Sequence, residues 1–361
     1  MATNKQKEIS IDERYREERQ PDKRARYSNW SAAKGLQAVD GLTTSAYLEK
    51  VAGEQIEGKY DAERAKELID SYYQTVASPQ EQENHAEADR VAARINILIS
   101  EKSFTLSTEE LLSIHQRLFD GVFPFAGQIR KNNIAKDEWV LMGDTVIYGD
   151  AYHLRTSLDS CLKKERFTSF ASLDDDERIA HFARFCAEMW QLHPFSEGNT
   201  RTTAVFMIKY LRKLGYEIDN SVFQNHSRYF RDALVRANYA NLKQNFFEEY
   251  AFLEAFFSDL LYGTKHDLRS RLLLIQPDGP LVLRQEHSLE QGIQEMIASE
   301  PGITRQEMAD RLGVSVKTVE RRLKSMGLVH GGANKKGKWQ KREPSILRSR
   351  DGSNSNLKLN L

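Results

Sequence analysis

The chain has 361 residues, enough for two or three domains, and its 52 Lys and Arg residues balance 52 Asp and Glu residues, so no global charge favours nucleic acid or a membrane surface. Its two cysteines, Cys161 and Cys186, exclude a disulfide framework and fit a reducing compartment. The polar start lacks a signal-peptide core and no apolar run approaches the ~20 residues that span a bilayer, so we expect a cytoplasmic protein with no membrane partner.

The first part of the chain is predicted to be an arm followed by helices. Residues 1–26 are dense in charges and are expected to form a flexible arm. Apolar residues recur at helical spacing over residues 27–76. The polar stretch 78–83 is expected to break these helices from a core of residues 84–275, in which helical patterns dominate.

The helical pattern of the core is interrupted over residues 125–148. Two short β-prone pieces, 139–141 and 146–148, flank a turn sequence, Gly143-Asp144. This arrangement predicts a small β-hairpin.

The stretch 193–201 reads His-Pro-Phe-Ser-Glu-Gly-Asn-Thr-Arg and joins two apolar helical patterns. A polar loop that leads into a helix N-terminus can bind an anion, because the first backbone N–H groups have no partner within the helix. Arg201 adds a fork of donors for a phosphate, and Glu197 is a carboxylate that suits Mg²⁺. His193 can accept a proton near neutral pH. Together these residues indicate a nucleotidyl or phosphoryl transfer site.

The residues after 275 predict a separate small module. A linker at 276–286 precedes the module at 287–342, and a flexible tail follows at 343–361. A short helix with Thr304 as its N-cap, a tight turn and a second helix at 316–326 have helix-turn-helix spacing, and a basic hairpin follows. The module resembles a winged helix, which binds either DNA or proteins. The candidate DNA-binding residues are Lys317, Thr318, Arg321, Arg322, Lys336 and Lys338.

The 193–201 stretch resembles the signature of Fic-domain proteins, His-Pro-Phe-x-Asp/Glu-Gly-Asn-Gly/Lys-Arg. That family is helical and typically moves AMP from ATP to a Ser, Thr or Tyr hydroxyl of a target protein. The resemblance implies that His193 is the general base and that Glu197 binds Mg²⁺. It also implies that Gly198 and Asn199 shape the anion hole and that Arg201 binds the outer phosphates of ATP.

Thr200 is the one departure from the signature. Glycine at this position is typical of AMP-transferring members, and lysine is typical of the kinase-like Doc branch, so Thr200 leaves the transferred group open between them. A β-branched residue restricts the backbone, but threonine fits if it is the first or second residue of a helix. Its hydroxyl could then add a donor to the nucleotide site.

Two further parts of the core are implied to contact substrates. The predicted hairpin resembles the Fic flap, which aligns a target segment by strand addition. Trp139 within it is as consistent with packing as with a target contact. The segment 231–239 resembles the border of the adenine site, where Asn238 and Tyr239 are candidates to contact the base; a role in capping and packing the helix is the alternative.

The N-terminal helices resemble VbhA-type antitoxins, in which a glutamate of an inhibitory helix contacts an arginine of the Fic loop. The best alignment places Asp40 on that glutamate, and a rival alignment places Glu57 there. Ala204 stands where the family has its second arginine, so the usual inhibitory pair cannot form. We hypothesise weak gating through Asp40 and Arg201; a purely structural helical pair is the alternative.

The sequence therefore predicts a mainly α fold: a Fic helical core with a small β-hairpin flap, plus a C-terminal winged-helix domain. The expected function is Mg²⁺- and ATP-dependent transfer of AMP to a hydroxyl of a target protein, or of the chain itself. The alternatives are a Doc-like kinase and a nucleotide-sensing transcription regulator without transferase activity. The sequence does not decide the oligomeric state, and a homodimer stays open.

Overall fold

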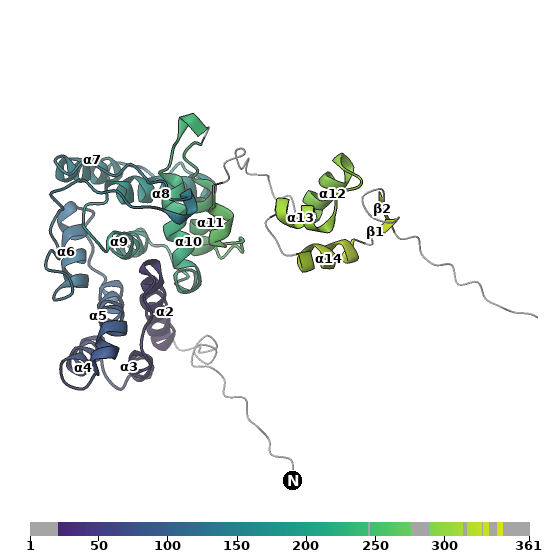
Figure 1. Ribbon diagram of the computed structural model, residues 1–361. Coiled ribbons are helices and arrows are strands. Elements are labelled where there is room, and N and C mark those ends of the chain that lie inside the picture. Colours follow the sequence, from purple (N-terminus) through teal and green to yellow (C-terminus); the bar gives the residue numbers. More distant parts are fainter. Residues whose placement is uncertain are drawn as a thin grey trace, which may run out of the picture. The chain divides into compact units, whose positions relative to one another are not determined.

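The computed structural model of this chain describes residues 21–244, 246–275, 289–312, 316–326, 328–331 and 338–341. These residues are mainly helical, which confirms the mainly α part of the predicted fold class. The chain divides into two compact units, Met1–Pro280 and Leu281–Leu361 (Figure 1). Among the described helices, none combines the length and the apolar character needed to cross a membrane.

The first unit begins with a group of helices that includes the segment predicted as 27–76. These elements are α2 (Pro21–Gly35), the 3₁₀ helix η1 (Leu36–Asp40), α3 (Ala46–Ile56), α4 (Ala62–Thr75) and α5 (Pro79–Ser100). Helix α2 starts at Pro21, so the last residues of the predicted arm, 21–26, are helical. The rest of the arm lies outside the described residues.

The helices do break before the polar stretch 78–83, since α4 ends at Thr75 and α5 begins at Pro79, but residues 79–83 belong to α5. Ser78 caps α5, because its side chain accepts from the N–H of Glu81 and the Glu81 carboxylate accepts from the N–H of Ser78. Pro79 occupies the first helical position, where its missing N–H costs nothing. The same polar residues therefore start a 22-residue helix.

The rest of the first unit surrounds the loop 193–198. Its elements are α6 (Thr108–Phe119), η2 (Trp139–Leu141), α7 (Leu154–Arg166), α8 (Asp175–Leu192), α9 (Asn199–Lys213), α10 (Ser221–Ala237), η3 (Leu242–Gln244), α11 (Ala251–Tyr262) and η4 (Ser270–Leu273). Helix α8 ends at the loop and α9 starts directly after it, so two largely buried helices fix both ends of the loop.

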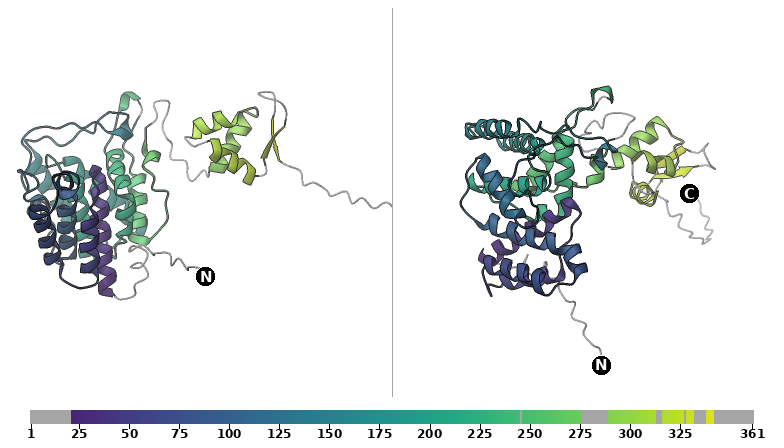
Figure 2. Two further views of the ribbon diagram at one scale, coloured as in Figure 1. Left: turned by 60° about the horizontal axis from the view of Figure 1, so that its bottom comes forward. Right: turned by 60° about the vertical axis from the view of Figure 1, so that its left-hand side comes forward.

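One hydrophobic cluster joins the N-terminal helices to the rest of this unit. Trp30 and Leu36 are buried together with Trp190 and Phe206. Figure 2 shows α2 alongside α10, and Gly35 explains how closely they pack: a Cβ there would lie 2.3 Å from the Cα of Gln224. The N-terminal helices are thus an integral layer of this unit.

The predicted β-hairpin at 125–148 is wrong in its secondary structure, because no residue of this segment is in a strand. The N–H of Glu138 donates to the carbonyl of Asp144, but the N–H of Lys136 donates to the hydroxyl of Thr145 rather than to a main-chain carbonyl. Between them, the 3₁₀ turn η2 buries Val140. The hydroxyl of Thr145 and the inward turn η2 thus take the place of the hydrogen bonds between two strands. We call residues 125–148 the flap segment.

The second unit contains the two expected helices followed by two paired strands, and residues 313–315 and 332–337 lie outside the described residues. Its elements are α12 (Leu289–Ser299), α13 (Arg305–Leu312), α14 (Val316–Ser325), β1 (Leu328–Gly331) and β2 (Lys338–Lys341), and the two strands pair antiparallel. Thr304 caps α13 as predicted, accepting from the N–H of Glu307. Trp339 of β2 completes the small core by donating to the carbonyl of Ile303 at 2.8 Å.

Candidate active site

The loop 193–198 has two residues with left-handed backbone conformation. His193 ends α8 with φ 48°, and Gly198 precedes α9 with φ 78°. A Cβ at Gly198 would lie 2.4 Å from the ring of Phe119, so both the backbone angle and the space require glycine. The predicted shaping role of Gly198 therefore has a local physical basis.

Asn199 closes the loop on itself. Its side-chain amide donates to the carbonyl of Phe195 at 2.7 Å and its oxygen accepts from the N–H of Phe195 at 2.9 Å. Phe195 is buried, as expected for an anchor under the loop. Asn199 is thus committed to the loop backbone, which fits the predicted shaping of an anion hole better than a direct contact with phosphates.

Thr200 is the second residue of α9, a position that suits threonine. Its hydroxyl accepts a hydrogen bond from the indole N–H of Trp190 at 3.0 Å. The residue that departs from the Fic signature therefore links α9 to α8 and keeps the loop closed.

His115 supports the loop, and the sequence analysis did not identify it. This fully buried side chain stacks on Phe195 with ring centroids 3.7 Å apart. One ring nitrogen accepts from the N–H of Gly127, so the other is the protonated one and donates to the carbonyl of Glu197 at 3.0 Å. Burial lowers the pKa of His115 to about 4, which keeps this arrangement neutral. A histidine on the apolar face of α6 was the available signal.

Arg130 holds the other end of the loop and was also missed. Its buried guanidinium donates to the carbonyl of His193 at 2.8 Å and to that of Asn132 at 2.7 Å. It also donates to the carbonyls of Gly149 and Leu192. One cation thus satisfies carbonyls from the flap segment and from the end of α8, and it fixes the backbone that presents His193.

His193 is enclosed and neutral. Its ring lies 4.3 Å from that of Tyr148 and 5.0 Å from that of Trp190. Burial, and then the positive charge of Lys136, hold the pKa of His193 well below its usual value. Its buried Nδ1 has no hydrogen-bond partner among the described residues. An imidazole that stays unprotonated at neutral pH is able to accept a proton.

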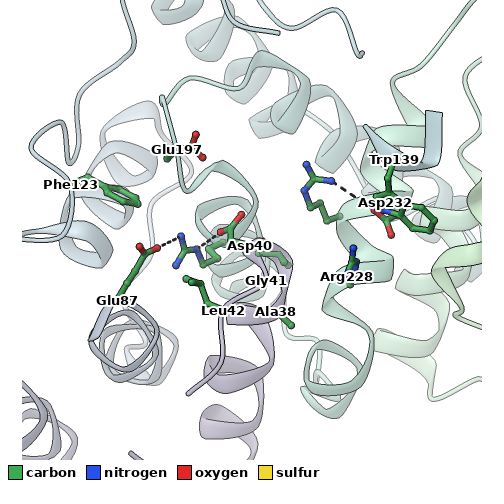
Figure 3. Close-up of a pocket in the computed structure, with 13 residues that line it drawn as sticks. Ala38, Asp40, Gly41, Leu42, Glu87, Phe123, Trp139, Glu197, Arg228 and Asp232 are labelled. Atoms are coloured by element: carbon green, nitrogen blue, oxygen red, sulfur yellow. Dashed lines mark hydrogen bonds and ion pairs between the residues drawn. The ribbon is translucent and has the colours of Figure 1, made fainter. Parts of the chain in front are cut away.

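Glu197 and Arg201 face a cavity of about 540 Å³ (Figure 3). The carboxylate of Glu197 is half-exposed and pairs with the ammonium of Lys136 at 3.0 Å. The lining residues are Ala38, Val39, Asp40, Gly41, Leu42, Glu87, Phe123, Trp139, Glu197, Arg201, Arg228, Arg231 and Asp232. Residues of the N-terminal helices, of the loop and of α10 therefore share one cavity.

Arg201 is buried and is held by two carboxylates from the N-terminal helices. Its Nε lies 2.7 Å from Oδ2 of Asp40, and an Nη donates to Glu87 at 2.8 Å. It also donates to Gln37, and its guanidinium lies over the ring of Phe119 at 4.8 Å. Dashed lines in Figure 3 mark these ion pairs of Asp40 and Glu87.

The two inhibitory candidates differ in position. Asp40 lines the cavity and pairs with Arg201, whereas Glu57 pairs with Lys23 of α2 and is not part of the lining. Glu87, which the sequence analysis did not identify, is the second carboxylate on Arg201. Only the alignment that uses Asp40 brings the N-terminal segment to the loop.

The far end of the cavity contains a buried acid–base group. Arg231 forms two hydrogen bonds with Glu138 of the flap segment, at 2.7 and 3.0 Å. The indole N–H of Trp139 donates to Asp232 at 3.0 Å, and the guanidinium of Arg228 lies 5.8 Å from the Trp139 ring centre. Trp139 therefore packs against α10, while part of it lines the cavity.

Asn238 and Tyr239 do not line this cavity. The amide of Asn238 donates to the carbonyls of Ala187 and Leu234, and the hydroxyl of Tyr239 donates to Asp144 at 2.7 Å. Helix capping and packing use their polar atoms here, which favours the alternative, and their contact with a base stays a prediction.

The candidate DNA-binding residues fall on the expected elements. The backbones of Lys317, Thr318, Arg321 and Arg322 belong to α14, and that of Lys338 belongs to β2. Lys336 lies outside the described residues.

Comparisons with known proteins match the two units separately. Residues 105–211, which include the loop 193–201, match the model of the Fic/DOC family. This part of the chain is therefore similar to a Fic/DOC domain. Residues 290–327 match the model of the winged helix-turn-helix DNA-binding family, so the C-terminal unit contains such a motif.

Two curated relatives carry names that describe an activity. The chain is 32% identical over 131 residues to the probable protein adenylyltransferase y4lH of Sinorhizobium fredii, covering 35% of this chain and 62% of the relative. It is 32% identical over 111 residues to the protein adenylyltransferase VbhT of Bartonella schoenbuchensis, covering 31% of this chain and 22% of the relative. The chain thus spans less than two thirds of each.

Among solved structures, the Fic family protein from Desulfovibrio desulfuricans G20 is similar over 91% of this chain and 90% of that chain. The sequence identity is 13% and the TM-score is 0.44.

Proposed function

We propose that this chain is a protein adenylyltransferase, which transfers AMP from ATP to a hydroxyl of a target protein or of the chain itself. The observation that carries the proposal is one loop that presents a neutral imidazole, a half-exposed carboxylate and a guanidinium at the start of α9. The names of the two curated relatives support the same activity.

His193 acts as the general base in this proposal. A target hydroxyl gives its proton to the imidazole as its oxygen attacks the α-phosphorus of ATP. The new O–P bond forms while the bond to the bridging oxygen of the β-phosphate breaks, and pyrophosphate leaves with that electron pair. Arg130 and His115 hold the two ends of the loop, so the imidazole needs little rearrangement before the step.

The phosphates are bound by Arg201 and by the first N–H groups of α9. The negative charge of the phosphates is favoured at a helix N-terminus and by the guanidinium fork. Because Arg201 is deeply buried, its attraction to an anion is weakly screened by solvent.

Glu197 fits a bound Mg²⁺ ion. Its half-exposed carboxylate already pairs with a cation, the ammonium of Lys136. The described residues contain no group of three or more metal-binding side chains, which suits an ion that takes most of its ligands from phosphates and water. Bound there, Mg²⁺ would neutralise charge on the phosphates.

The N-terminal helices gate the site in this proposal. Asp40 and Glu87 bind the same guanidinium that must bind the phosphates, so ATP has to displace them. Neutralising both should strengthen ATP binding. Glu57→Gln is the matched control, because Glu57 pairs with Lys23 away from the cavity. Truncation near residue 83 is a poor test, since it cuts α5 and exposes the shared core.

The position of the label in ATP tests the proposed activity. The double variant Asp40→Asn/Glu87→Gln is incubated with cell lysate and with ATP labelled at either the α- or the γ-phosphate. Transfer of the α-label alone supports an adenylyltransferase. Transfer of the γ-label would instead show the Doc-like kinase, and nucleotide binding without any transfer would favour a nucleotide-sensing regulator.

A second function, DNA binding, is favoured by the family match of residues 290–327. Contacts to phosphates by a basic helix and wing would make the affinity fall steeply with salt. A gel shift of the full chain with its own promoter should show binding that weakens with salt. Binding to no DNA fragment at low salt would instead indicate protein docking by this unit.

A further inference from the structure

A lysine of the flap segment contacts the catalytic loop. Lys136 Nζ lies 3.0 Å from Oε2 of Glu197. The main-chain N–H of Lys136 is anchored at 3.2 Å to the hydroxyl of Thr145, on the returning half of the flap segment. The lysine backbone is thus fixed, while its flexible four-carbon stem lets the ammonium change partners.

The charge of Lys136 acts on the general base as well as on the carboxylate. Among the charged groups around His193, Lys136 has the largest effect on the imidazole, ahead of Arg130 and Arg231. The ammonium that pairs with Glu197 is therefore also the charged group that lowers the pKa of His193 most.

The ion pair of Lys136 is more exposed than those of Arg201 and Arg231. Arg201 is buried and has two carboxylate partners, and Arg231 has two hydrogen bonds to the buried Glu138. By contrast, 54% of the Glu197 side chain and 29% of the Lys136 side chain are exposed. An exposed pair of this kind contributes only ~0–1 kcal/mol, so it can be exchanged at little cost.

Glu197 has two competing cations if it also binds a metal ion. An ammonium and a divalent cation on one carboxylate repel each other, so metal binding weakens the hold of Glu197 on Lys136. A nucleotide bound at the loop would offer its phosphate oxygens as new partners for the released ammonium. A flap-borne cation there would stabilise the charge that develops as the α-phosphate is attacked.

We propose that Lys136 is a further catalytic residue, whose ammonium exchanges Glu197 for the phosphate oxygens of bound ATP. This inference rests on the proposed function. Lys136 then competes with the metal ion at Glu197 and also contacts the substrate. Removing its charge should therefore strengthen metal binding but lower kcat.

The test compares Lys136→Gln with Lys136→Arg and with Lys131→Gln, an exposed lysine elsewhere on the flap segment. Binding of Mn²⁺ alone to the full chain is measured by electron paramagnetic resonance, and transfer is followed with α-labelled ATP. Lys136→Gln should bind Mn²⁺ up to about fivefold more tightly, as loss of a competing pair worth ~1 kcal/mol implies. Its kcat should fall about 100-fold. Lys131→Gln should keep both values near those of the native chain, and Lys136→Arg, which retains the charge, should fall between the native chain and Lys136→Gln in both.

Opposite shifts in metal affinity and kcat support the proposal. Unchanged kcat in Lys136→Gln, or weaker Mn²⁺ binding, overturns it, because the lysine would then be a spectator or merely structural. If the native chain binds Mn²⁺ but Lys136→Gln matches it in both readouts, only this inference fails. If the native chain does not bind Mn²⁺ and the Asp40→Asn/Glu87→Gln chain does not transfer the label, the proposed function fails with it. Circular dichroism checks that each variant is folded.

Discussion

The cavity has a side formed with the flap segment and a side formed with the N-terminal helices, and on each side an arginine pairs with carboxylates. On the flap side Arg231 meets Glu138, whose side chain is 1% exposed and also accepts from Tyr148. On the N-terminal side Arg201 meets Asp40 and Glu87, whose side chains are 34% and 32% exposed. A buried carboxylate is costly to leave unpaired, whereas a partly exposed one can turn to water. The first pair therefore fixes structure, and the second can give way to a ligand.

The largest expected effect on activity comes from removing the imidazole of His193. His193→Ala should reduce transfer of AMP by about 10³-fold, within the range that a positioned general base contributes. The measurement is single-turnover transfer of α-label in the Asp40→Asn/Glu87→Gln background, where Arg201 is available. The melting temperature should remain close to that of the parent. A variant that retains most of its activity would show that His193 is not the base.

Breaking the flap-side pair should cost stability. Glu138→Gln leaves the guanidinium of Arg231 without its charged partner, and we expect a loss of about 3 kcal/mol in the free energy of unfolding. Glu87→Gln is the matched change on the other side and should alter stability by less than about 1 kcal/mol. Denaturant unfolding measures both. Equal losses in the free energy of unfolding would show that the two sides do not differ in this way.

Acid should weaken the fold through His115. Its pKa is about 4 in the folded chain and 6.5 in an ordinary setting, so the unfolded chain binds the extra proton first as the pH falls. The stability that depends on neutral His115 is present above pH 6.5 and is lost progressively down to pH 4, by about 3 kcal/mol. His115→Gln should flatten this part of the stability profile in urea unfolding. An unchanged profile would contradict the assignment.

The sequence was informative where the contacts are local. The loop 193–201 is contiguous, and Thr304 caps its helix within one turn, so short motifs carried both predictions. Contacts between distant residues were out of reach. Glu87 and Arg201 are 114 residues apart, and only the packing of α5 beside the loop brings them together.

The prediction of a β-hairpin in the flap segment was wrong for a related reason. Its β-prone residues favour strands, but a hydroxyl of Thr145 takes the N–H of Lys136, and Val140 is drawn inward. Tertiary burial therefore outweighed local propensity. In the same way, nothing near Arg130 in the sequence reveals that the carbonyl of His193 needs a donor, because that need arises from the left-handed end of α8.

The binding of ATP tests the exchangeable side of the cavity most directly. Calorimetric titration with ATP and Mg²⁺ compares the native chain with Asp40→Asn/Glu87→Gln and with the Glu57→Gln control. Couplings of 1–3 kcal/mol are typical of such competition, so the double variant should bind about 10- to 100-fold more tightly while the control matches the native chain. Equal affinities for all three proteins would contradict the account, because Arg201 would then not be the group for which the carboxylates and the phosphates compete.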